Sequence, residues 1–179
     1  EILCKEAAAP RGAQGRVHQR PLLRHLEHRI PQRPRIVILD LVYKVQLAVL
    51  AFALLGLQAN VSGSIRLDGT EIVGRSVRDI LNLGVGFVPE DRNVDGLVGD
   101  FTVAENLMLD RLSGPPFVTG GMIRLGTRDD FAAKAVEEFD VRTQGIHEPV
   151  SRLSGGNQQK VVLARELSRD LRLLVACQP

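Results

Sequence analysis

A serine followed by two glycines opens a helical stretch near the end of this chain, and this feature constrains the fold most. Ser154 stands at the N-cap position, and Gly155 and Gly156 have no side chains to cover the first backbone N–H groups of the predicted helix over 155–171. Such a helix N-terminus favours anions, because its amides and its dipole both attract negative charge. A capped helix without a ligand has the same pattern, so other features must decide between the two.

Short apolar runs of strand length alternate with stretches of helical periodicity. The strand-like runs are residues 36–39, 84–88 and 173–176. The helical stretches are residues 44–55, 77–83 and 155–171. Strands that alternate with helices in this way predict an α/β fold.

Turn signals divide the remaining chain. Asp68-Gly69 lies at the centre of the alternating segment 64–72 and predicts a β-hairpin, because this dipeptide adopts the positive φ that a tight turn needs. The Gly- and Pro-containing segments 114–116 and 120–121 are expected to be turns between helical segments.

Two threonines carry helix-start signals. Thr102 precedes Glu105 by three residues, which predicts a capping box at the start of a helix. Thr127 precedes Asp130 by the same spacing and predicts a second helix start. An apolar face follows on that second helix, made of Phe131, Ala135, Val136 and Phe139.

Composition argues against several classes of partner and site. The net charge of +2 is too small to indicate nucleic acid or an anionic membrane surface as a partner. The longest apolar run, 47–57, is shorter than the roughly 20 residues that a membrane-spanning helix needs. Cys4 and Cys177 lie far apart, and His25 and His28 have no third ligand at a suitable spacing. The sequence therefore predicts neither a disulfide scaffold nor a metal site.

The segment 153–160 resembles the signature motif of ABC-type ATPases in the form that ends Gly-Gly-Asn-Gln-Gln-Lys. This form is typical of ribose-type importers of sugars and nucleosides, and the resemblance is to the C-terminal nucleotide-binding domain of their tandem ATPases. It covers about residues 56–179. Within it, 88–92 resembles the Q-loop, with Glu90 in place of the usual glutamine, and 102–107 resembles the start of the helical subdomain.

The resemblance implies a fold and a domain organisation. The expected fold is an α/β, P-loop-NTPase-like ABC nucleotide-binding domain with an antiparallel β-hairpin and a helical subdomain at about 100–155. This partial domain would occupy 36–179 and be incomplete at both ends, after an irregular or disordered segment over 1–35.

The resemblance also implies functional residues. The signature residues Ser154, Gly155, Gly156 and Asn157 would bind, in trans, the γ-phosphate of ATP held by a second domain. The Q-loop residues Glu90 and Arg92 would contact the metal and the membrane partner.

Two departures from the family pattern concern the chain's own ATP site. The phosphate loop should lie near 41–48, yet no glycine occurs between Gly15 and Gly56, and bulky side chains block the close approach of phosphate. Cys177 stands where the Walker B aspartate should bind Mg²⁺, and Gln178 stands where the catalytic glutamate should act as a base. We therefore expect no intact catalytic residue and no ATPase activity from the chain alone.

The leading hypothesis is a partial ATP-binding subunit of a sugar or nucleoside importer, which uses ATP and Mg²⁺ through the partner domain's site. Its expected partners are a second nucleotide-binding domain, a transmembrane permease and, indirectly, a solute-binding protein, with no nucleic acid. The expected location is cytoplasmic, at the inner face of the plasma membrane. Two alternatives stay open: a non-functional remnant, which would lack a cooperative melting transition, and a soluble ABC ATPase acting on DNA or ribosomes, which would show salt-dependent nucleic-acid binding.

Overall fold

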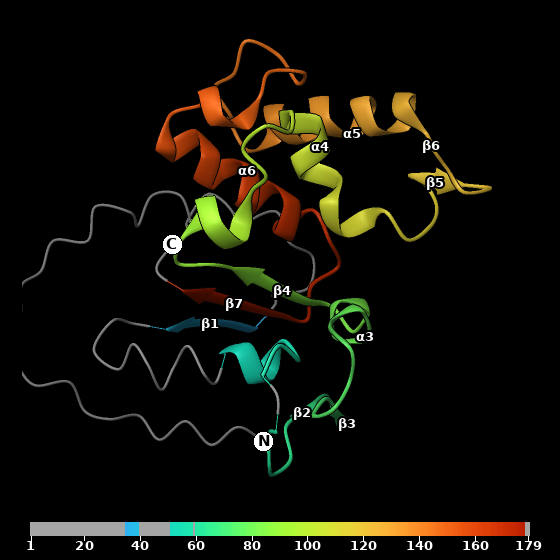
Figure 1. The fold of residues 1–179 in the computed structure, drawn as a ribbon, viewed down its shortest axis with the longest axis vertical. Helices are drawn as coiled ribbons and strands as arrows, with labels where there is room; N and C mark the ends of the chain where they lie inside the picture. The colour runs from blue at the N-terminus through green and yellow to red at the C-terminus, as the bar shows by residue number, and fades with distance from the viewer. Residues whose placement is uncertain (1–34, 40–50, 59, 178–179) are drawn as a thin grey trace, which may run out of the picture.

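The computed structural model describes residues 35–39, 51–58 and 60–177 (Figure 1). A parallel three-stranded sheet has the order β1–β7–β4, so the last strand in the chain lies between the other two. The strands are β1 (Arg35–Leu39), β4 (Val85–Val88) and β7 (Leu173–Cys177). All three predicted strands are confirmed to within a residue at either end.

Both faces of β7 are buried, which explains its uninterrupted apolar sequence. Leu173 and Val175 pack into one core cluster, and Leu174 and Ala176 pack into the other. Successive side chains of a strand point to opposite faces, so a central parallel strand covered on both sides must be apolar throughout. The first cluster includes residues from 51–55 and α3 (Val77–Asn82), and the second is formed mainly by three larger helices.

The larger helices lie together on one side of the sheet (Figure 1). They are α4 (Val103–Met108), α5 (Leu125–Glu138) and α6 (Gly155–Leu167). Three short helical turns accompany them: the π-type turn η2 (Arg92–Gly96), and the 3₁₀ turns η3 (Leu109–Arg111) and η4 (Val150–Arg152). This arrangement confirms the predicted α/β class.

The predicted hairpin at Asp68-Gly69 is confirmed. It joins β2 (Arg66–Leu67) and β3 (Thr70–Glu71), and its two turn residues have φ values of 48° and 79°. Gly56 also has a positive φ, 70°, and a Cβ there would lie 2.8 Å from the carbonyl oxygen of Arg75. The helical residues 51–54 end just before Gly56, as predicted, whereas most of the predicted helix 44–55 lies outside the described residues.

One of the two predicted helix starts is confirmed and the other is wrong. Thr102 forms the complete capping box with Glu105 at the start of α4. Thr127, in contrast, lies inside α5, because the carbonyl oxygen of Arg124 already accepts the first helical hydrogen bond, from the Arg128 amide. The Arg124 amide is itself bonded to the carbonyl oxygen of Phe117, so a contact outside the local motif sets where α5 begins. The predicted apolar face is correct, since Ala135 and Phe139 are buried and Phe131 and Val136 pack against the same cluster.

Two further boundaries differ from prediction. Helix α6 ends at Leu167, four residues early, where the Ser168 hydroxyl donates to the carbonyl oxygen of Ala164. The segment around Gly120 and Gly121 is more than a turn, because it joins β5 (Val118–Thr119) and β6 (Met122–Ile123) in a second hairpin.

Two expectations lie outside the described residues. They concern the segment 1–35, of which only Arg35 is described, and the phosphate-loop position 41–48. Within the described part, no helix has the length and apolar character needed to cross a membrane.

Candidate functional site

The N-terminus of α6 is the centre of the candidate site. Ser154 is its N-cap residue, with extended backbone dihedrals, as the sequence predicts. Its side chain makes no capping hydrogen bond, although serine usually makes one at this position. Ser154 and Gly156 are exposed, and a Cβ built on Gly156 would have no heavy atom within 4 Å. Ser154 and Gly156 therefore lie at an open surface that an anion can approach.

Asn157 orients the Ser154 hydroxyl. Its Nδ2 donates to the Ser154 Oγ over 3.0 Å, and its Oδ1 accepts from the backbone amide of Arg142 over 2.9 Å. The bond to Arg142 fixes the orientation of the Asn157 side-chain amide, so that its NH₂ group faces Ser154. Because Oγ accepts from Asn157, its own proton stays available for donation to a ligand.

The next residues of the motif anchor the helix. Gln158 donates from Nε2 to the carbonyl oxygen of Val150 over 3.2 Å. Lys160 lies 2.7 Å from the Asp140 carboxylate and also donates to the Asp140 carbonyl oxygen. The Lys160 hydrogen bond lowers the pKa of Asp140 below its usual value. The Asn-Gln-Gln-Lys ending thus includes three residues that set the position of the helix start.

The Q-loop candidates lie between β4 and η2. Glu90 follows Pro89 and is exposed, and Arg92 begins η2 and is half-buried. Arg92 donates from Nε to Gln158 Oε1 over 3.3 Å, so the structure brings Arg92 to the signature helix. This contact joins two motifs that are 66 residues apart.

Cys177 ends β7 beside the Q-loop segment. It lines a cavity of about 580 Å³ together with Glu90, Arg92, Asp95 and Phe52, among others. Burial raises the pKa of the Cys177 thiol, and the Glu90 carboxylate raises it further. The thiol is therefore protonated at neutral pH, and a neutral thiol does not fit Mg²⁺, which prefers oxygen ligands. Gln178 lies outside the described residues.

The described residues offer no metal site of the chain's own. They contain no cluster of three or more His, Cys, Asp or Glu side chains arranged to hold an ion.

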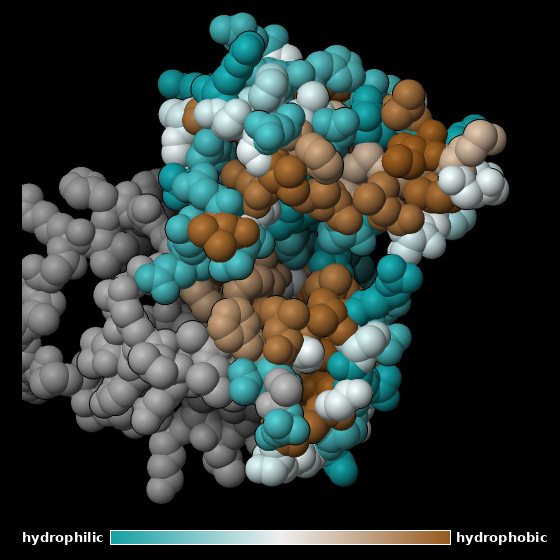
Figure 2. Space-filling view, viewed as in Figure 1, coloured by the Kyte–Doolittle hydropathy of each residue, from teal (hydrophilic) through white to brown (hydrophobic). Residues whose placement is uncertain are grey.

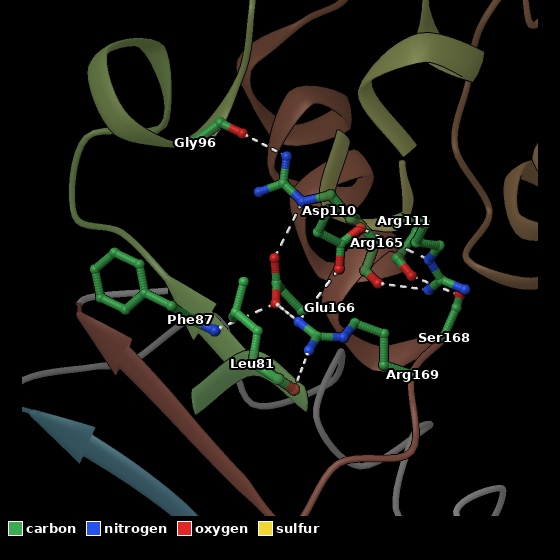
Figure 3. A network of polar contacts seen from close by, with 10 residues as sticks. Leu81, Phe87, Gly96, Asp110, Arg111, Arg165, Glu166, Ser168 and Arg169 are labelled. Atoms are coloured by element: carbon green, nitrogen blue, oxygen red, sulfur yellow. Dashed lines mark hydrogen bonds and ion pairs between the residues drawn. The ribbon is translucent and has the colours of Figure 1, made fainter. Parts of the chain in front are cut away.

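A buried charged network lies at the other end of α6 (Figure 3), and sequence reasoning missed it. Arg165 donates from Nη1 to the carbonyl oxygen of Gly96 over 2.8 Å and from Nε to Glu166 Oε1 over 3.0 Å. Glu166 Oε2 accepts from the Phe87 amide over 3.3 Å. Burial raises the pKa of Glu166 and outweighs the opposite effect of Arg165.

Arg169 completes the network. It lies 3.2 Å from the Asp110 carboxylate and donates from Nη2 to the carbonyl oxygen of Leu81 over 2.6 Å. The network therefore connects α6 with η2, β4, η3 and α3. A sequence signal for this network does exist. Arg165 and Glu166 are adjacent charged residues among apolar ones, and Arg169 follows about one helical turn later.

The parallel sheet is covered on both faces and lies beside a helix with a glycine-rich start, which together define an α/β domain. Residues 48–179 match the family model described as ABC transporter. The chain belongs to the ABC transporter family.

Known relatives extend this assignment. The chain is 44% identical over 127 residues to the nucleoside import ATP-binding protein NupA of Lactococcus lactis subsp. cremoris. It is 38% identical over 130 residues to the ribose import ATP-binding protein RbsA 2 of Rubrobacter xylanophilus. These matches cover 71% and 73% of this chain but 25% of each relative, so the chain spans about a quarter of their length.

The solved structures agree on the fold. The dimeric ATP-binding cassette MJ0796, in a post-hydrolysis state with ADP and Pi, matches with a TM-score of 0.60 at 19% identity. The match covers 80% of this chain and 60% of that one. The expected ABC ATP-binding fold is thereby confirmed.

Proposed function

We propose that this chain is part of the ATP-binding subunit of an importer for sugars or nucleosides, and that it contributes the signature half of a composite ATP site. The observation that carries the proposal is the Ser154 hydroxyl, which accepts from Asn157 instead of capping its own helix. Donors held in this way stabilise negative charge on a phosphoryl group that is being transferred. The names of NupA and RbsA 2 support sugars and nucleosides as the transported class.

The chain's own half-site is degenerate in this proposal. The glycine-free segment 16–55 offers no phosphate loop, and Cys177 and Gln178 replace the metal ligand and the base. ATP and Mg²⁺ are bound instead by a second nucleotide-binding domain, whose ATP γ-phosphate meets Ser154 and the amides of Gly155 and Gly156. The dimeric form of MJ0796 supports a paired arrangement.

An exposed apolar surface supports a permease as the further partner. Leu57, Val94 and Val98 are 56%, 74% and 39% exposed and border a cavity of about 370 Å³. Figure 2 shows apolar residues gathered around a hollow between the sheet and the helices above it. An apolar surface rimmed by polar residues is typical of a protein interface. In this proposal the chain works at the inner face of the plasma membrane, and its helical subdomain spans about 100–155.

The proposal is tested in a reconstituted pair of this chain and an ABC nucleotide-binding domain that has a complete phosphate loop and Walker B motif. Ser154→Arg fills the phosphate position and should abolish the pair's ATPase activity. The variant should melt at the same temperature as the wild type, because Ser154 is exposed and makes no capping bond. Unchanged ATPase activity in the Ser154→Arg pair would show that the motif is only structural.

The same preparations separate the remaining hypotheses. A cooperative melting transition of the wild-type chain excludes a remnant that does not fold. DNA or RNA binding that weakens steeply with salt would favour a nucleic-acid-associated ATPase over an importer subunit.

A further inference from the structure

The signature helix α6 holds the turn η2 at two points. At the start of the turn, Arg92 is bonded to Gln158 through Nε. At its end, the carbonyl oxygen of Gly96 is bonded to Arg165. Both partners lie on α6, about two turns apart, so the turn that follows the Q-loop lies along one side of that helix.

Close packing accompanies these hydrogen bonds. A Cβ built on Gly96 would lie 3.0 Å from the Pro89 side chain, 3.3 Å from Arg92 Cβ and 3.4 Å from a methyl group of Val162. Val162 belongs to α6 and is fully buried. The turn therefore has no free space between the Q-loop proline and the signature helix.

The two glycines of the signature have different surroundings. A Cβ built on Gly155 would lie 2.6 Å from Arg92 Nη2, whereas one on Gly156 would meet nothing within 4 Å. A glycine at 155 makes room for the guanidinium of this chain's own arginine. A glycine at 156 leaves room for something outside the chain.

We infer that Arg92 is a positioning residue for the signature helix. It lies against Gly155, bonds Gln158, and with the Arg165 contact fastens η2 to α6 as one unit. This inference rests on the proposed composite site. It assigns the Cα side of Gly155 to the contact with Arg92, and it leaves the Gly155 amide and Gly156 to the ligand.

A double-mutant cycle in the reconstituted pair tests the inference. Arg92→Ala should lower kcat by about 2- to 30-fold, the range for residues that modulate coupling between sites. The KM for ATP should stay the same, because the partner's phosphate loop holds the nucleotide. Arg92→Lys should not restore kcat, because a lysine ammonium lacks the planar fork that lies on Gly155 and reaches Gln158.

Gly155→Ala tests the contact between Gly155 and Arg92 directly. In the wild-type background its methyl group displaces Arg92, so kcat should fall to the level of Arg92→Ala. In the Arg92→Ala background the same change should have no further effect, because the clashing group is gone. Arg66→Ala is the matched control, since Arg66 lies in β2, is 63% exposed and pairs with Glu71; its kcat should equal that of the wild type.

Three outcomes separate the inference from the function on which it rests. If Ser154→Arg abolishes ATPase activity while Arg92→Ala and Gly155→Ala leave kcat unchanged, the positioning role is overturned and the composite site stands. If Gly155→Ala is equally harmful in both backgrounds, the Cα side of Gly155 faces the ligand instead of Arg92, and the inference is also overturned. If Ser154→Arg has no effect, the composite site itself fails. Should Arg92→Ala melt below the assay temperature, Arg92→Met keeps the apolar stem and takes its place in the cycle.

Discussion

Arg165 donates a hydrogen bond to the carbonyl oxygen of Gly96 over 2.8 Å, across 69 positions of sequence. Arg165 and its neighbour Glu166 are 7% and 5% exposed, so their polar groups find hydrogen-bond partners inside the protein and not in water. The bond fixes η2, which follows the proposed Q-loop residues, to α6, whose start carries the proposed signature. It therefore matters both for stability and for the geometry of the site.

Arg165→Met should lower the free energy of unfolding by about 1–3 kcal/mol, because the Gly96 carbonyl oxygen and Glu166 Oε1 lose this buried donor, while Arg169 still lies 3.5 Å from Glu166. Urea denaturation at neutral pH measures this change. Arg172→Ala is the control, since Arg172 lies 3.8 Å from Asp68 in an exposed pair and should cost less than about 1 kcal/mol. A loss at Arg165 no larger than that at Arg172 would contradict the structural role of the network.

Thr102→Ala should lower the free energy of unfolding by about 0.5–2 kcal/mol, because it removes the side-chain cap of α4. Thr127→Ala should have no cost or stabilise slightly, because Thr127 lies inside α5, where alanine has the higher helix propensity. Parallel urea titrations compare the two substitutions. Equal losses at both positions would mean that α5 begins at Thr127 after all.

Glu105 gives the stability of α4 a pH dependence. The Thr102 amide and hydroxyl both donate to the Glu105 carboxylate over 2.8 Å, and these bonds lower the pKa of Glu105 below its usual 4.5. A carboxyl group whose pKa is lower in the folded state stabilises that state above its unfolded pKa, and this contribution is lost as the pH falls through the folded pKa.

Glu105→Gln keeps an acceptor in the capping box but removes the charge. The stability difference between wild type and variant should be present at neutral pH and should shrink as the pH falls below 4.5. Urea midpoints measured at several pH values give this difference. A difference that stays constant down to about pH 2, or grows on acidification, would show that the ionised carboxylate is not what the box uses.

Local signals predicted the elements that local chemistry determines. The Asp68-Gly69 turn and the Thr102 cap each depend on residues within a few positions, and both were correct. The Thr127 signal has the same local form, but the contact between the Arg124 amide and Phe117 starts the helix earlier. A capping pattern therefore predicts a helix more safely than it predicts the residue at which the helix begins.

The candidate site was predictable only in part for the same reason. Ser154 and the glycines were found because the helix N-terminus is a local feature. The contact of Arg92 with Gly155 and the contact of Arg165 with Gly96 depend on how β4 and α6 pack, and no spacing rule gives that information.

The composite-site assignment is tested most directly by ATP-dependent association. Sedimentation velocity is run on this chain mixed with an ABC nucleotide-binding domain that binds ATP but cannot hydrolyse it. A complex should form with ATP and not without it, and Ser154→Arg should eliminate the complex, because the ATP held by the partner must bridge to the signature of this chain. Association that is equally strong without ATP, or unaffected by Ser154→Arg, would contradict the assignment.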